Sequence, residues 1–445
     1  MFYSTLVPHR LLLFGFISII LLCSYLLTLP VASASGNSQP FIDAMFIATS
    51  AISTTGLSVV DIGTFYSTFG QIIILVLIQI GGLGYMIFIV LVMFGLGVRL
   101  SLGGKLILEE SVGSPPYKDV IRFSKIVIFI TFIFEFLGAI CLSLYWMNEF
   151  SVGRAIYLGT FHSISAFCTA GFSLFPNNLS AYHDSIVVNT VVNILCIGGS
   201  VGFIVIYDIY YSIFGKIHET DLPKRMLTHT KLVLTVLPIL IVTGIFLIYV
   251  SEWNAPSLAP KDRFLSSIFH AISASTTTGF NTSDLGTMKT LGLTTMIILM
   301  YIGASPGGTG GGVKTTTFGL LISCIVSVIS MKDEVILFNR RIPSITKDKA
   351  IAICASSILL IMIAVLTLSF TENASFMEIV FESVSAFGTV GLSTGITSSL
   401  STAGKLVICI TMLIGRVGPL AIGYSIKGKR KIVPVKYPEG VMLVG

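Results

Sequence analysis

The sequence predicts an all-α integral membrane protein built from four consecutive modules. Each module would contain a membrane span, a short helix that enters the membrane only part of the way, and a second span. Three observations lead to this prediction. Only 11% of the 445 residues are charged, 54% are hydrophobic and the mean hydropathy is +0.93, whereas soluble domains carry about 25% charged residues. One polar motif recurs four times, and a glycine motif follows each copy at a nearly constant distance.

The polar motif reads Phe-x-(Ala/Ser)-x-Ser-Ala-x-x-Thr-x-Gly-(Leu/Phe), and its copies cover residues 46–57, 161–172, 269–280 and 381–392. Its glycines recur at intervals of 108 to 115 residues, which are too long for solenoid repeats and indicate whole modules. The glycine motif, Ile-Gly or its equivalent, covers 80–82, 197–199, 302–304 and 414–416. Glycines that only let helices pack closely would explain the second motif but not the first.

The first two modules follow this order along the chain. The apolar run 11–30 is long enough to span a bilayer, and we expect it to be retained, although Ala32-Ser33-Ala34 is similar to a signal-peptidase site. Module 1 covers residues 1–98, with a short segment at 41–53 and a second span at 71–97. Module 2 covers residues 122–214, with its three segments at 125–147, 154–168 and 185–214.

The last two modules repeat the pattern. Module 3 covers residues 231–331, with segments at 231–250, 263–276 and 291–331. Module 4 covers residues 348–427, with segments at 349–370, 375–388 and 405–426, and a tail at 428–445 ends the chain. The spacing of Ser375 and Glu378 predicts a capping box at the start of the fourth short helix.

The last span of module 3 is predicted to be broken. Residues 303–312 read Gly-Ala-Ser-Pro-Gly-Gly-Thr-Gly-Gly-Gly, and inside a helix each glycine costs about 1 kcal/mol and proline about 3 kcal/mol. Irregular backbone at membrane depth is tolerated only where it is buried in protein or lines a water-filled cavity. We therefore predict an intramembrane loop at 303–316. Because it lies about half-way along the span and has nothing apolar to face lipid, we interpret it as a gate.

Basic residues indicate the orientation of the chain. They gather in the linkers at 99–125, 216–231 and 332–349 and in the tail at 427–436. The opposite side carries only Arg154, Lys261, Arg263, Lys289 and Lys405. Since lysine and arginine accumulate in cytoplasmic segments, both termini and all linkers of this multi-pass protein are predicted to be cytoplasmic. The short helices would then enter from outside.

The motif strings have the chemistry of a cation site. A short helix entering from outside directs its partly negative C-terminal end toward the middle of the membrane. The strings that follow carry no ionised side chain, so backbone carbonyls are the remaining ligands, and glycine allows the backbone to turn them inward. Four strings around one central pore would form a pseudo-four-fold, potassium-channel-like ring that replaces the hydration shell of a potassium ion. The predicted ion-binding residues are Thr54, Thr55, Gly56, Thr169, Ala170, Gly171, Thr277, Thr278, Gly279, Thr389, Val390 and Gly391.

These features resemble the Trk/Ktr/HKT superfamily of cation transporters. The resemblance rests on four such modules in one chain, one motif glycine per module and the glycine-rich break in module 3. The length, the short N-terminus and the ending at 437–445 are similar to the KtrB/KtrD type of bacterial membrane subunit. The resemblance implies potassium uptake across the bacterial cell (plasma) membrane. It implies potassium preference, because glycine stands at all four motif positions.

The resemblance also implies partners. It predicts a homodimer in which each protomer has its own pore, bound to a cytoplasmic ring of RCK subunits of KtrA/KtrC type. Nucleotide is expected only on that partner, no cofactor is expected in this chain, and no nucleic acid partner is expected. Sodium as a co-transported or an activating ion, and the KtrB or KtrD subtype, are left open.

The gate prediction centres on the loop and two basic residues. Arg416 lies within an apolar run, and a charge inside the membrane is a functional hypothesis by default. In the family the matching arginine lies beside the gating loop, so we expect it to bind a carbonyl or hydroxyl of 305–312. Lys314 is expected either beside the loop or at the cytosolic mouth. The predicted gating residues are Gly303, Ser305, Gly307, Gly308, Thr309, Gly310, Gly311, Gly312, Lys314 and Arg416.

Several alternatives stay open at this stage. Glu135 is expected either to face a neighbouring helix or to act in transport, and His162 and His270 are expected to pack on the short helices. An alternating-access transporter with inverted repeats is the main rival, although all four repeats run in the same direction. A membrane-embedded enzyme is a weaker rival, because the sequence has no His-Glu-x-x-His, no Gly-x-Ser-x-Gly and no paired intramembrane Asp.

Overall fold

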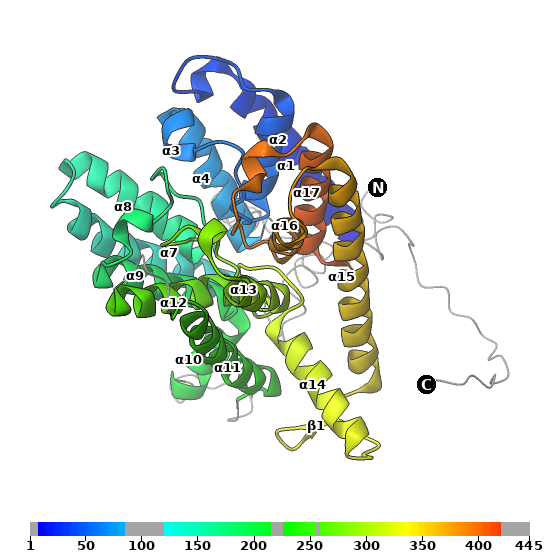
Figure 1. Cartoon of the computed structure of the whole chain (residues 1–445). Helices are drawn as coiled ribbons and strands as arrows, with labels where there is room; N and C mark the ends of the chain where they lie inside the picture. Colours follow the sequence, from blue (N-terminus) through cyan, green and yellow to red (C-terminus); the bar gives the residue numbers. More distant parts are fainter. Residues whose placement is uncertain (1–7, 85–119, 215–225, 254–258, 420–445) are drawn as a thin grey trace, which may run out of the picture.

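The computed structural model describes residues 8–84, 120–214, 226–253 and 259–419 (Figure 1). In this part the chain is mostly helical with almost no sheet, as predicted. The predicted end of the module 1 second span, most of the first two linkers, the end of the last span and the tail at 428–445 lie outside the described residues.

Module 1 contains α1 (Pro8–Thr28), α2 (Phe41–Ile52), α3 (Ile62–Phe65) and α4 (Thr68–Leu83), with a 3-10 turn at Pro30–Ala32. The short helix α2 coincides with the predicted short segment. Asp61 and Ser67 cap the N-termini of α3 and α4. Each side chain accepts a hydrogen bond from the backbone N–H three residues later, at Thr64 and Gly70, which supplies partners for otherwise unsatisfied donors.

Module 2 contains α7 (Val120–Trp146), α8 (Val152–Phe167), α9 (Ile186–Ser200) and α10 (Phe203–Phe214). The predicted span at 185–214 is not a straight helix, because α9 and α10 meet at a bend of 90°. Gly202 in the bend has a φ of +98°, and the N–H of Phe203 donates to the carbonyl of Gly307 at 2.9 Å. The loop of module 3 therefore lies against the bend.

Module 3 contains α11 (Thr228–Ser251), α12 (Pro260–Ser275), α13 (Thr290–Ile302) and α14 (Thr315–Ile329). Its last span is interrupted between α13 and α14, where the glycine-rich sequence predicts the break. A two-residue antiparallel ladder of β1 (Ile336–Leu337) and β2 (Arg340–Arg341) follows. The all-α prediction did not include this hairpin.

Module 4 contains α15 (Ser344–Thr371), α16 (Phe376–Gly388) and α17 (Thr402–Val417). The predicted capping box at the start of α16 is confirmed. Ser375 N–H donates to the Glu378 carboxylate at 2.8 Å, and Glu378 N–H donates to the Ser375 hydroxyl at 3.4 Å.

Among the described residues, three helices are long and apolar enough to cross a membrane, namely Phe123–Trp146, Thr228–Ser251 and Ser344–Thr371, and the bent pair α9–α10 would make a fourth. They carry exposed apolar side chains such as Phe129 and Phe136, each 66% exposed, which suits a lipid-facing surface. The count of eight spans stays a prediction.

The modules pack in a cycle. The second span of each module packs against the short helix of the next, α4 on α8, α9 on α12, α13 on α16, and α17 back on α2. Figure 1 accordingly shows the last helix, α17, beside α2 from the start of the chain. The cycle surrounds the C-terminal ends of α2, α8, α12 and α16, which are buried.

The glycine motif serves this packing. A Cβ added at Gly81, Gly199 or Gly415 would collide with the carbonyl that ends the short helix of the same module, at Ile52, Phe167 and Phe387 respectively. These glycines therefore let each second span approach its own short helix closely. Gly303 departs from the pattern, because it faces Gly311 of its own loop.

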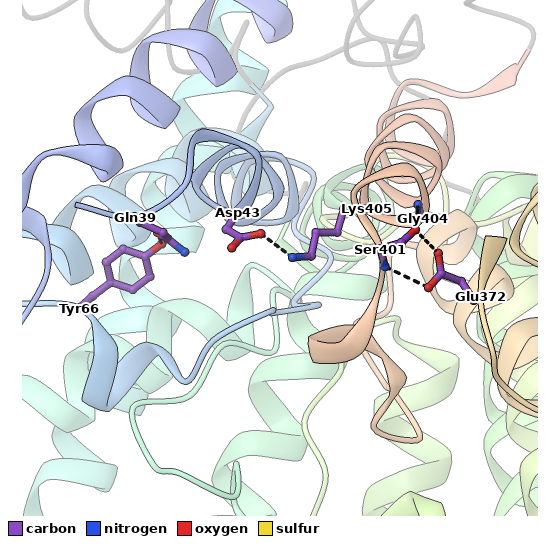
Figure 2. A network of polar contacts seen from close by, with 7 residues as sticks. All are labelled: Gln39, Asp43, Tyr66, Glu372, Ser401, Gly404 and Lys405. Carbon is purple, nitrogen blue, oxygen red and sulfur yellow. Dashed lines mark hydrogen bonds and ion pairs between the residues drawn. The ribbon is translucent and has the colours of Figure 1, made fainter. Parts of the chain in front are cut away.

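A polar network joins the first and last modules where the cycle closes (Figure 2). Lys405 of α17 forms an ion pair with Asp43 of α2 at 2.6 Å, and the two side chains are only 15% and 18% exposed. Nearby, the Ser401 hydroxyl donates to the Glu372 carboxylate at 2.5 Å and the Ser401 N–H donates to it at 3.0 Å. Burial alone would raise the pKa of Glu372, but these hydrogen bonds hold it below its ordinary value.

Candidate functional site

The four motif strings share one backbone conformation. The threonine near the end of each short helix has a φ between +50° and +55°, at Thr54, Thr169, Thr277 and Thr389. The motif glycine two residues later has a φ between +65° and +95°, while the residue between them does not have a positive φ. A backbone in which residues of positive and negative φ alternate can turn successive carbonyls toward the same side. Threonine adopts this conformation only where surrounding structure imposes it.

In module 1 the motif serine, Ser50, holds the string in this conformation. The Ser50 carbonyl accepts a hydrogen bond from Thr55 N–H at 2.8 Å, and its hydroxyl accepts one from Gly56 N–H at 3.0 Å. The bond to the carbonyl recurs at 2.8–2.9 Å in the other modules, at Ser165, Ser273 and Ser385. The hydroxyl bond to the glycine recurs in two of them, at Ser273 and Ser385.

These serines were missed by the sequence reasoning as functional residues. They are buried within the short helices, and they tie each string to the last turn of its helix. The available signal was the recurrence of serine at the same place in all four motifs. A repeated small polar residue in an apolar helix needs a hydrogen-bond partner, and the string that follows supplies one.

The four strings form a closed ring. A Cβ added at each motif glycine would collide with a carbonyl oxygen of the next module's string, in the order Gly56 to Ala170, Gly171 to Thr278, Gly279 to Val390, and Gly391 back to Thr55. The side chains between threonine and glycine are fully buried. All twelve predicted ion-binding residues are thus brought together, and none carries an ionisable side chain.

Four helix C-terminal ends meet at this ring. The helices α2, α8, α12 and α16 each lead directly into a string. The C-terminal end of a helix carries a partial negative charge, so the surroundings of the ring favour a cation without any carboxylate. No group of three or more His, Cys, Asp or Glu side chains that could hold a metal ion occurs in the described ranges.

The loop between α13 and α14 lies against the threonine end of the ring. The Thr54 hydroxyl donates to the Thr309 carbonyl at 3.2 Å, and the Thr169 and Thr309 hydroxyl oxygens are 3.0 Å apart. The Thr277 hydroxyl accepts a hydrogen bond from Gly311 N–H at 3.2 Å. One short loop segment therefore contacts the strings of three modules by hydrogen bonds.

The fourth threonine meets the same segment without bonding to it. A Cβ added at Gly311 would collide with the Thr389 side chain. The Thr389 hydroxyl is buried and has no hydrogen-bond partner among the residues that the structure describes.

The loop is also fixed to the bend of module 2. Ser305 N–H donates to the Ser200 carbonyl at 3.0 Å, and Thr309 N–H donates to the Gly199 carbonyl at 3.0 Å. A Cβ added at Gly308 would approach the Ser200 carbonyl to 2.8 Å. The loop glycines Gly303, Gly307 and Gly312 have φ values of +69°, +73° and +79°, so the fold of the loop depends on them.

The two predicted basic residues both bind the loop. Arg416 donates to the carbonyls of Thr309 and Gly81, so it joins the loop to α4, and its expected partner within 305–312 is present. Lys314 donates to the carbonyls of Gly310 at 2.5 Å and Gly311 at 3.3 Å. It therefore lies beside the loop.

The remaining candidates have structural partners. His162 and His270 are fully buried, and each ring accepts a backbone N–H from the segment after its string, at Leu174 and Thr282, with both distances 3.3 Å. The expectation that they pack on the short helices is confirmed. Glu135 is 5% exposed and faces α4, where it accepts a hydrogen bond from Gln79 at 3.3 Å.

Comparison with known sequences agrees with this architecture. The model of the TrkH family, described as cation transport proteins, matches residues 15–427. The chain is 36% identical to Ktr system potassium uptake protein B of Bacillus subtilis, over 98% of this chain and 97% of that protein. It is 34% identical to potassium/sodium uptake protein NtpJ of Enterococcus hirae, over 98% and 97%.

The fold is also similar to a solved structure. The crystal structure of the potassium transporter TrkH from Vibrio parahaemolyticus superposes with a TM-score of 0.68 at 19% sequence identity, covering 92% of this chain and 83% of that one. At this identity the likeness concerns the fold. From the family match and from relatives of more than 30% identity over nearly the whole length, the chain belongs to the TrkH family of cation transport proteins.

Proposed function

We propose that this chain is the ion-translocating subunit of a Ktr-type system that takes up potassium across the plasma membrane. The observation that carries the proposal is the closed ring of four strings, in which each motif glycine faces a carbonyl of the next module. Carbonyl rings of this kind replace the hydration shell of potassium. Relatives named as potassium uptake proteins cover nearly the whole chain.

The selectivity filter would be the twelve-residue ring. Its threonines are held in left-handed conformations by the motif serines, so the carbonyls are preorganised and cannot easily close around a smaller ion. Glycine at all four positions leaves the backbone free of side chains. We infer a preference for potassium over sodium.

The loop would be the gate. It is bound to the threonine end of the ring, and Arg416 and Lys314 hold it there through carbonyls of Thr309, Gly310 and Gly311. Ions leaving the ring at this end would meet the loop. Release of these contacts would open a path between the ring and the cytosol.

The proposal includes partners and a second ion. The name "Ktr system" of the relatives denotes a system of more than one component, and we infer a homodimer on a cytoplasmic ring of RCK subunits. The name of the Enterococcus relative includes sodium, so sodium is a candidate coupling or activating ion.

Crosslinks from cytoplasmic lysines such as Lys347 to an added RCK ring would support the predicted orientation, and crosslinks confined to Lys261 or Lys289 would reverse it.

A growth experiment tests the proposed function. The chain, expressed together with the RCK subunit of its system, should restore growth at low potassium to a bacterium that lacks its own potassium uptake. A strain carrying the same chain with Gly279→Asp provides the comparison, because a side chain there would collide with the Val390 carbonyl. Restoration by neither strain, with both chains present in the membrane, would contradict the proposal.

A further inference from the structure

We propose that the four ring threonines form a cation site, and that a potassium ion cannot bind there while the loop is closed. This threonine site consists of Thr54, Thr169, Thr277 and Thr389, and the inference rests on the proposed function. It adds a regulatory property to the gate, since the transported ion itself would favour opening.

The loop occupies hydroxyl groups that a cation would need. The Thr277 hydroxyl oxygen accepts Gly311 N–H at 3.2 Å, so a lone pair that would ligate a cation is engaged. The Thr169 hydroxyl lies 3.0 Å from the Thr309 hydroxyl, and the Thr54 hydroxyl donates to the Thr309 carbonyl at 3.2 Å. The loop therefore contacts three of the four hydroxyls and engages a lone pair of Thr277 directly, while the Thr54 hydroxyl also donates to the Ser53 carbonyl at 2.7 Å.

The fourth hydroxyl is the independent sign of a ligand. Thr389 has a relative exposure of 0%, and its hydroxyl has no hydrogen-bond partner in the described part of the chain. Buried hydroxyls are usually paired, because an unpaired one costs about 1–3 kcal/mol. A cation or its bound water at the centre of the ring would supply the missing partner.

The positive charges that bind the closed loop disfavour a cation in the threonine site. Arg416 donates to the Thr309 carbonyl, and Lys314 donates to the Gly310 carbonyl at 2.5 Å. The Gly311 N–H also directs its positive end at the ring through Thr277. Like charges repel strongly away from bulk water, so the closed loop and an ion in the threonine site destabilise each other.

A reciprocal dependence follows from this competition. If loop closure weakens cation binding by a given factor, cation binding weakens loop closure by the same factor. A change that loosens the loop without touching a ring residue should therefore tighten potassium binding. A loop that only blocks the path would change flux and leave the binding affinity as it was.

The test uses Thr309→Ala in the purified full-length chain. The substitution removes the hydroxyl that contacts Thr169 and the Phe167 carbonyl and leaves all ring residues in place. Potassium binding is titrated calorimetrically in a choline background, and rubidium uptake is measured in proteoliposomes. We expect the potassium Kd to fall about two- to tenfold, the size of one lost hydrogen bond, and uptake to rise. Thr309→Ser should restore both values.

Two further variants separate the outcomes. Thr295→Ala removes a threonine hydroxyl that bonds only within α13, to the Leu291 carbonyl at 2.8 Å, and should change neither value. Thr389→Val should raise the Kd at least twofold without raising uptake, because its hydroxyl has no bond to the loop.

The result that overturns the inference is specific. Higher uptake by Thr309→Ala with an unchanged Kd, or an unchanged Kd for Thr389→Val, would show that loop and ion do not share the threonine site. Either result would leave potassium transport intact. Failure of the proposed function would instead appear as wild-type chain that neither binds potassium in preference to sodium nor carries rubidium.

Discussion

Gly56 illustrates how a single residue determines the geometry of the ring. Its φ is +95°, and the Ala170 carbonyl of the next module lies where a side chain would begin. Gly56→Ser should therefore displace that carbonyl and lower the preference for potassium over sodium, measured as the ratio of the two uptake rates. Gly153→Ser is the matched control, because nothing lies within 4 Å of a Cβ there. A ratio that is the same in wild type, mutant and control would argue against a filter at this ring.

Arg416 is the residue to test at the gate. In the sequence alignment of the four glycine motifs the residues matching Arg416, namely Gly82, Gly199 and Ala304, are small. Arg416 contacts the loop from another module, whereas Lys314 belongs to the loop itself. Arg416→Met should raise basal uptake several-fold, since a hydrogen bond from a charged group contributes about 1.5–3 kcal/mol. The basal uptake of Arg416→Lys should lie between that of the wild type and that of Arg416→Met. Uptake equal to wild type in Arg416→Met, at matched protein amount, would make this arginine a structural residue.

At the scale of single residues, the sequence predicted the residues of the ring but not the serines that hold them in place. The repeated Thr-x-Gly strings predicted which residues meet, and the structure brings them together. The motif serines went unassigned, because a buried serine in an apolar helix is also compatible with simple packing. Thr389 shows the same limit, since its unpaired hydroxyl depends on where the loop of another module lies.

The loop at 303–314 is the element whose removal is most informative. It is anchored to Gly199 and Ser200 of module 2 and to the ring threonines. Deleting Gly307 to Gly311 should raise potassium uptake strongly and leave the potassium-to-sodium ratio close to wild type, because the ring strings are not altered. The measurement is uptake into proteoliposomes, with size-exclusion elution as the check on folding. A normally folded deletion with unchanged uptake would locate the gate elsewhere.

The elements also show where prediction from sequence ends. Glycine and proline at 303–312 marked the break in module 3, since intrinsic helix propensity is strongly unfavourable there. The 90° bend between α9 and α10 was not predicted, because Val201 and Gly202 lie in an apolar run without proline. At the bend, the N–H of Phe203 bonds to the carbonyl of Gly307, about one hundred residues away in the sequence. Long-range contacts of this kind leave no periodic signal in the sequence.

The whole molecule depends on closing the cycle between its first and last modules. These modules are not consecutive in the chain, so non-covalent contacts such as Asp43–Lys405 must hold them. Asp43→Ala should lower the melting temperature clearly, because it leaves the lysine charge partly buried and unpaired. Glu334→Ala is the control, since its pair with Arg341 is 43% and 72% exposed and such pairs contribute about 0–1 kcal/mol. Equal melting temperatures for the two variants would show that the ion pair does not hold the cycle closed.

The pseudo-four-fold arrangement was predicted from four copies of one module that run in the same direction along a single chain. The order of that closure, with each second span on the next short helix, required the structure. So did the hairpin at 336–341, whose two strands are too short to give an alternating pattern.

The most direct test of the central claim is ion selectivity in the simplest system. Purified chain reconstituted in proteoliposomes is assayed for uptake of potassium and of sodium under the same driving force. The ring of four glycine-ended strings predicts that potassium enters much faster than sodium, and that Gly56→Ser reduces the difference. Equal uptake of the two ions by the wild-type chain would contradict the account.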